Sequence, residues 1–114
     1  MKPTLRAIVW ETTERLLDQL HITPGTAFPI AMMVEVKKEE AVPAVRSELQ
    51  RLGIEVAAVD KTWWPFGRRW QMAAKAPPQP VSRTEIDHWL DRLETVLAPH
   101  DADVVTWVPQ VPGA

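Results

Sequence analysis

Residues 41–59 read AVPAVRSELQRLGIEVAAV, and this stretch predicts a helix that runs directly into a strand. Its apolar residues recur at the three- and four-residue spacing of one helix face: Val42, Val45, Leu49 and Leu52. Pro43 is tolerated only in the first turn of a helix, so the helix should begin near residue 40. Gly53 is a typical C-terminal cap, and IEVAAVD at 54–60 then favours a strand.

The segments on either side predict two further strands. FPIAMMVEV at 28–36 alternates, and one side of that strand would carry its larger apolar residues, Ile30, Met32, Val34 and Val36. RRWQMAAKA at 68–76 would point three residues inward, Trp70, Met72 and Ala74. KTWWPFG at 61–67 would connect this strand to the strand at 54–60, as a hairpin too long for a two-residue turn.

The C-terminal third predicts a connector, a helix and a last strand. PPQPV at 77–81 would be stiff, since its prolines have no backbone donor. SRTE at 82–85 matches a capping box, in which Ser82 accepts a hydrogen bond from the amide of Glu85. A continuous apolar stripe follows, formed by Ile86, Trp89, Leu90, Leu93, Val96 and Leu97. Pro99 would end the helix, and DVVTWVPQV at 103–111 predicts a strand.

The N-terminal segment adds one helix before this series. Residues 4–20 place six apolar residues at helical spacing: Leu5, Ile8, Val9, Leu16, Leu17 and Leu20. The predicted order is therefore α–β–α–β–β–α–β. Without its first helix this order is βαββαβ, which predicts an α+β fold of the ferredoxin-like type. In that fold two helices cover one face of a four-stranded antiparallel sheet.

The other face of such a sheet would be unusually apolar. Simple alternation assigns these residues to it: Ala31, Met33, Ala57, Val59, Ala73, Val105 and Trp107. Side chains of this kind are poorly suited to water, so we expect either the first helix or a second copy of the chain to cover them.

Length and composition are those of one globular domain spanning residues 1–114. The absence of cysteine excludes disulfides and thiolate metal sites and fits the cytoplasm. No apolar run reaches the length of a membrane helix, and the charged N-terminus does not look like a signal peptide. We therefore expect a cytoplasmic protein without a membrane partner.

No catalytic signature stands out in the chain. The three histidines, His21, His88 and His100, are far apart and lack metal-ligand spacing. Ser47 lies within a predicted helix, Ser82 serves as a cap, and four glycines form no phosphate-binding loop. We expect no catalytic residue, no metal and no cofactor, and hence a protein that is not an enzyme.

The charges are unevenly distributed. Residues 61–83 carry a formal charge of +5, against a net charge of −2 for the whole chain. Residues 85–103 are acidic, and Asp87, Asp91 and Glu94 lie close together on the predicted last helix. Such carboxylates can bind a cation or transfer protons. Because they lie on the polar side of the predicted helix, the favoured interpretation is a surface exposed to solvent. They form the second candidate contact surface.

The stretch KTWWPFGRRW at 61–70 concentrates large aromatic side chains at a predicted turn. They could fold back onto the sheet and extend the core, or they could be exposed anchors for a partner. The first candidate contact surface consists of Trp63, Trp64, Phe66, Arg68 and Arg69. Stacking on single-stranded nucleic acid is a weaker alternative, because the chain as a whole is not basic.

The layout resembles the RraB family, bacterial regulators that bind and inhibit ribonuclease E. The resemblance is carried by the helix ETTERLLDQL, the strand FPIAMMVEV, the junction LQRLGIEV, the late helix EIDHWLDRLETVLAPHDADV and the strand VVTWV. It implies a non-enzymatic protein-binding module whose partner is an RNA-degrading enzyme. The chain lacks the very acidic C-terminal extension of some members, and the hairpin KTWWPFGRRW is individual.

Two alternatives from other classes remain open. Two copies of the chain could pair through their apolar sheet faces, giving a dimeric ligand-binding protein or a small enzyme. Residues 61–83 could instead bind single-stranded nucleic acid. The sequence does not decide between a monomer and a homodimer.

Overall fold

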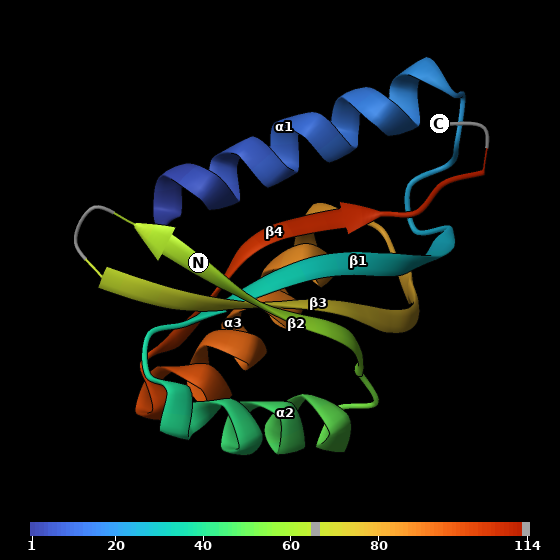
Figure 1. Ribbon diagram of the computed structural model, residues 1–114. Coiled ribbons are helices and arrows are strands. Elements are labelled where there is room, and N and C mark those ends of the chain that lie inside the picture. The colour runs from blue at the N-terminus through green and yellow to red at the C-terminus, as the bar shows by residue number, and fades with distance from the viewer. Residues whose placement is uncertain (65–66, 113–114) are drawn as a thin grey trace.

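The structure is a computed structural model that describes residues 1–64 and 67–112, without the side chains of residues 62–64 (Figure 1). Its helices and strands follow in the order α1 (Pro3–Gln19), β1 (Ala27–Val36), α2 (Val42–Arg51), β2 (Glu55–Trp64), β3 (Gly67–Pro80), α3 (Arg83–Leu97) and β4 (Ala102–Pro109). Short 3-10 turns, Glu39–Ala41 and Ala98–His100, precede α2 and follow α3. The predicted α+β fold, a helix followed by βαββαβ, is confirmed.

The four strands form one antiparallel sheet in the order β2-β3-β1-β4. In the centre of this sheet, Val34 of β1 lies opposite Met72 of β3 and Val104 of β4. Figure 1 shows α2 and α3 together on one side of the strands. This is the ferredoxin-like arrangement that the order of elements predicts.

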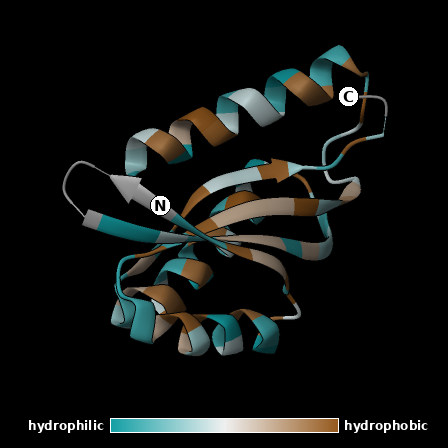
Figure 2. Cartoon of the chain, viewed as in Figure 1, coloured by the Kyte–Doolittle hydropathy of each residue, from teal (hydrophilic) through white to brown (hydrophobic). Residues whose placement is uncertain are grey.

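The core fills the space between the sheet and these two helices. β1 buries every second residue, Ile30, Met32, Val34 and Val36, as the alternation predicts. α2 contributes Val45 and Leu49, and α3 contributes Ile86, Trp89, Leu90, Leu93 and Leu97. Each fully buried side chain of this size stabilises the fold by about 1.5–3 kcal/mol. Figure 2 shows hydrophobic and hydrophilic residues following one another along each helix, as expected when only one face is buried.

Local signals fix the ends of the helices. The Ser82 side chain accepts a hydrogen bond from the amide of Glu85 at 3.3 Å, which is the first half of the predicted capping box. Pro43 lies in the first turn of α2. Gly53 follows α2 with a φ of 77°, a left-handed conformation that glycine adopts without strain. These residues place α2 and α3 where the sequence predicts them.

The connections on either side of β3 differ from the prediction. Trp64 pairs with Gly67, so only residues 65–66 lie between β2 and β3, and the predicted long loop at 61–67 is wrong. β-Branched and aromatic residues favour strands, and Thr62, Trp63 and Trp64 prolong β2.

β3 also runs on to Pro80, so the predicted connector at 77–81 is mostly strand. The ladder with β1 is irregular between Phe28 and Ile30, and Pro77 and Pro78 have no direct partner there, which fits residues that lack a backbone donor.

Two bulges also change which residues share a face. Ala57 is an extra residue in β2, and Val105 is an extra residue in β4. Val59 therefore lies opposite Met72 and Trp107 opposite Met32, on the side of the helices, where Trp107 is buried. The assignment of Val59 and Trp107 to the outer face is wrong, because each bulge shifts the two-residue alternation by one position.

The outer face is consequently more polar than the sequence suggests. Its central positions are half-buried, and they combine the apolar residues Ala31, Met33 and Ala73 with Glu35 and Gln71. Lys75, Ala58, Thr106 and Val108 around them are exposed. An antiparallel sheet commonly has one solvated face of this mixed kind.

α1 lies along β4, at the end of the sheet (Figure 1). Its buried residues follow one stripe, Val9, Thr13 and Leu17, whereas Ile8 is 55% exposed. On one side α1 contacts α3 through ion pairs, and on the other Leu16 lines a shallow apolar groove with Val108. The described part of α1 therefore flanks the edge of the sheet and leaves its outer face open.

Candidate functional site

The first candidate surface lies on a two-stranded extension of the sheet. β1 ends at Val36, which lies opposite Trp70 of β3 and Ala102 of β4. Beyond this row only β2 and β3 continue, with Thr62, Trp63 and Trp64 paired to Arg69, Arg68 and Gly67. We call these residues, 62–64 and 67–69, the arm. Figure 1 shows the ends of β2 and β3 projecting past the other two strands.

The base of the arm is tied to β1 by charge. The Arg69 guanidinium lies 3.5 Å from a carboxylate oxygen of Glu35, and both side chains are largely covered. Arg69 also donates a hydrogen bond from Nη1 to the backbone carbonyl of Arg68 at 3.0 Å. This ion pair joins the first residues of the arm to β1, one row before the end of that strand.

The structure brings together the backbones of most of the predicted contact residues. Trp63 and Arg68 are direct cross-strand partners, and Arg69 and Trp64 flank them within the arm. Arg68 is exposed. Phe66 lies outside the described residues, as do the side chains of Trp63 and Trp64. That these five residues contact a partner stays a prediction.

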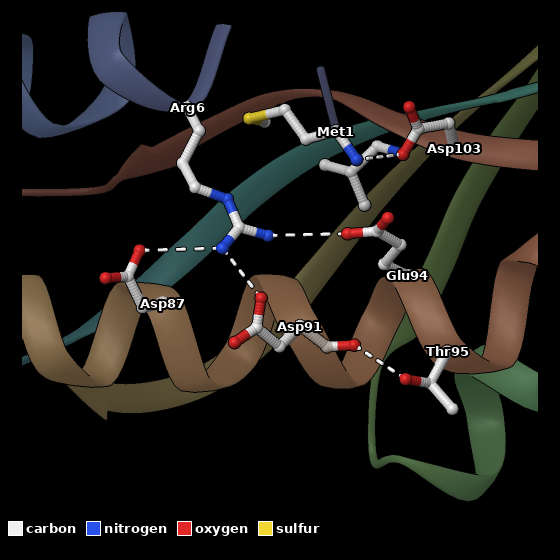
Figure 3. Close-up of polar contacts among 8 residues, drawn as sticks. Met1, Arg6, Asp87, Asp91, Glu94, Thr95 and Asp103 are labelled. Atoms are coloured by element: carbon white, nitrogen blue, oxygen red, sulfur yellow. Dashed lines mark hydrogen bonds and ion pairs between the residues drawn. The ribbon is translucent and has the colours of Figure 1, made fainter. Parts of the chain in front are cut away.

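The second candidate surface forms ion pairs with a residue of the same chain. It consists of Asp87, Asp91 and Glu94. Figure 3 shows Arg6 reaching from α1 into the three carboxylates of α3. Nη1 of Arg6 lies 2.7 Å from Asp91 and 3.7 Å from Asp87, and Nη2 lies 3.6 Å from Glu94. The Arg6 side chain is only 16% exposed. The predicted acidic cluster is therefore part of the contact between α1 and α3.

This contact continues along both helices. Arg83 of α3 lies 3.4 Å from Glu14 and 4.6 Å from the centre of the Trp10 ring. One side of α1 carries Arg6, Trp10 and Glu14, which are spaced four residues apart. On this side Arg6 pairs with carboxylates of α3 and Glu14 pairs with Arg83, so the charges of the two helices are complementary. The sequence does not predict this pairing, because the paired residues lie far apart along the chain.

The start of α1 is tied to the sheet by a further charge pair. The amino group of Met1 forms an ion pair with Asp103 of β4, close to the acidic cluster (Figure 3). Asp103 also accepts a hydrogen bond from the amide of Val104 at 2.8 Å. Attractive charges thus link α1 to both β4 and α3.

The basic segment at 61–83 does not form one continuous surface. Arg69 pairs with Glu35 of β1, and Arg83 pairs with Glu14 of α1. Lys75 lies opposite Glu55 in the ladder between β2 and β3. Nearby carboxylates reduce the positive potential that a nucleic acid would meet along this segment.

The three histidines lie at separate places in the structure. His21 follows α1 with a φ of 53°, His88 lies on α3, and both are exposed. His100 is half-buried in the turn after α3. Within residues 1–64 and 67–112, no group of three or more His, Asp or Glu side chains is placed to hold a metal ion.

Neither a comparison with models of known protein families nor one with curated proteins gives a match for the chain. Among the helices described here, none combines the length and the apolar character that crossing a membrane requires.

Proposed function

We propose that the chain is a non-catalytic regulatory module that binds another protein through the arm. The position of the arm is the observation that supports this most, because it carries Trp63, Trp64 and Arg68 past the ends of β1 and β4. Tryptophan and arginine are the residues most enriched at binding hot spots. A contact surface built from them at the end of a sheet fits a protein-binding role.

The partner we propose is a ribonuclease of the ribonuclease E type. The resemblance of the layout to the RraB family supports this choice. A protein that regulates another by direct contact depends more on a rigid binding surface than on a catalytic group. The Arg69–Glu35 ion pair holds the base of the arm to β1, and a restraint of this kind would lower the entropy cost of binding.

The proposal is tested by titrating the catalytic region of a ribonuclease E with the purified chain. Calorimetry gives the affinity, and cleavage of a labelled RNA gives the inhibition. The double variant Trp63→Ala/Trp64→Ala should bind at least about tenfold more weakly, as expected for hot-spot tryptophans. Val108→Ala is the matched control, since Val108 is 50% exposed and lies at the far end of the sheet.

Two outcomes would count against the proposal. If the unaltered chain neither binds the ribonuclease nor slows cleavage, the proposed partner is wrong. If the chain binds but the double variant and Val108→Ala bind equally well, the arm is not the contact surface.

A further inference from the structure

β2 leaves one edge of the sheet open. It occupies one end of the strand order, whereas α1 flanks β4 at the other end. In the described part of the chain, the backbone hydrogen bonds of β2 run to β3, and no other segment pairs with it. An edge strand presents backbone donors and acceptors that can pair with another extended chain.

The open edge is regular over residues 58–64. The bulge at Ala57 interrupts the ladder near the start of β2, and direct pairing with β3 then continues from Ala58 to Trp64. No proline breaks this stretch. A continuous edge of this length suits the addition of one strand, a common mode of peptide recognition.

The charges on this edge select the kind of strand that can be added. Asp60 and Lys61 are adjacent and exposed, and they point to opposite faces of the sheet. Two copies of the chain paired antiparallel about this dipeptide would place Asp60 opposite Asp60, or Lys61 opposite Lys61. Like charges directly opposite each other are destabilising, so these registers disfavour self-pairing.

We propose that residues 58–62 of β2 bind an extended segment of a partner protein, which adds to the sheet as a fifth, antiparallel strand. The segment would place Lys or Arg opposite Asp60, and Asp or Glu opposite Lys61. This inference rests on the proposed function, because it names the part of the partner that docks beside the arm. β2 is continuous with the arm, so one partner can contact both.

The probe is the synthetic peptide acetyl-TTEKVT-amide, which sets Glu opposite Lys61 and Lys opposite Asp60 in antiparallel register. It is added at millimolar concentration to the ¹⁵N-labelled chain and followed by NMR. We expect shifts at the amides of residues 58–62 and slower amide hydrogen exchange along that edge. The charge-reversed peptide acetyl-TTKEVT-amide should bind more weakly, by about two- to fivefold for each reversed pair.

The variant Asp60→Lys/Lys61→Asp provides the decisive control. Both positions are exposed, so the variant should keep the fold, which its NMR spectrum verifies. Its preference between the two peptides should be reversed. The proposal is overturned if the two peptides bind equally, if the preference is unchanged in the variant, or if neither peptide shifts the amides of β2.

The two proposals fail in different ways. If the peptides do not bind β2 but Trp63→Ala/Trp64→Ala still weakens binding of the ribonuclease, the edge-strand inference is wrong and the proposed function stands. If the peptides bind as expected and the ribonuclease does not, the partner is wrong and the edge remains a binding site.

Discussion

Trp89 of α3 has its ring in the core and a hydrogen-bond partner for its indole nitrogen. It is 8% exposed, and its indole Nε1 donates a hydrogen bond to Oε1 of Gln79 at 2.8 Å. The guanidinium of Arg92 lies 5.6 Å from the centre of its ring. The ring is buried against the sheet while its polar atom has a partner, which is the usual condition for burying tryptophan.

Trp89→Ala should therefore lower the free energy of unfolding by about 3–5 kcal/mol. Trp64→Ala should cost less, because Trp64 lies in the arm beyond the four-stranded part of the sheet. Chemical denaturation of both variants measures the difference. A larger loss for Trp64→Ala than for Trp89→Ala would mean that the two tryptophans have the opposite roles.

Arg6 is the second residue with a specific role, because it pairs α1 with three carboxylates of α3. Its replacement in Arg6→Gln leaves three carboxylates of α3 without their shared cation. We expect a loss of about 1 kcal/mol at low salt, and a smaller loss at high salt because partly exposed ion pairs are screened.

The control for Arg6→Gln is Arg51→Gln. Arg51 is highly exposed and pairs only with Glu48 among the described residues, so its replacement should change stability very little. Hydrogen exchange of the α1 amides should rise in Arg6→Gln and not in Arg51→Gln. Equal behaviour of the two variants would show that Arg6 does not hold α1 in place.

At the scale of the elements, the helices and the existence of each strand follow from the sequence. The stripes of α2 and α3 and the alternation of β1 are strong local patterns, and Gly53 and Ser82 mark helix ends by their own chemistry. The bulges at Ala57 and Val105 cannot be predicted in this way. One extra residue reverses the alternation without leaving a signal of its own, and so the faces of Val59 and Trp107 were predicted wrongly.

The bulges lead to a prediction about deletions. Removal of Val105 leaves Thr106 opposite Met33 and Trp107 opposite Met32, because Val105 is the extra residue. The deletion should fold and keep Trp107 buried, at a cost of about 1 kcal/mol for the half-buried valine. Tryptophan fluorescence and chemical denaturation measure both effects.

Deletion of Ala73 is the control for the bulge. Ala73 has a ladder partner on each side, Met33 and Ala58, so its loss moves a buried residue of β3 to the outer face. This variant should not fold. If the Val105 deletion is equally damaging, Val105 is not a dispensable bulge residue.

At the scale of the whole molecule, α1 is the part that the sequence places least well. Its helix is predicted, but its position depends on contacts between segments far apart, such as Arg6 with Asp91 and Arg83 with Glu14. Of the two candidate surfaces, the sequence predicts the arm as a hairpin rich in tryptophan. It also predicts the acidic cluster on α3, but not the contact of this cluster with Arg6. Long-range pairing of charges leaves no local pattern in one sequence.

The distribution of charge over the molecule predicts weak binding to nucleic acid. Residues 61–83 are basic, but Glu35 and Glu14 lie beside two of their arginines. In filter binding with a single-stranded RNA, we expect little retention even at low salt, and no steep dependence on salt concentration. Strong, salt-sensitive binding would favour a nucleic-acid partner over a protein.

The central claim is that the indole rings of the arm are available to another molecule. Hydrogen exchange of the indole N–H groups, assigned by single Trp→Phe variants, tests it most directly. We predict fast exchange at Trp63 and Trp64 and slow exchange at the buried Trp89 and Trp107. Exchange at Trp63 and Trp64 as slow as at Trp107 would show that the rings pack within the chain, and would contradict the proposal.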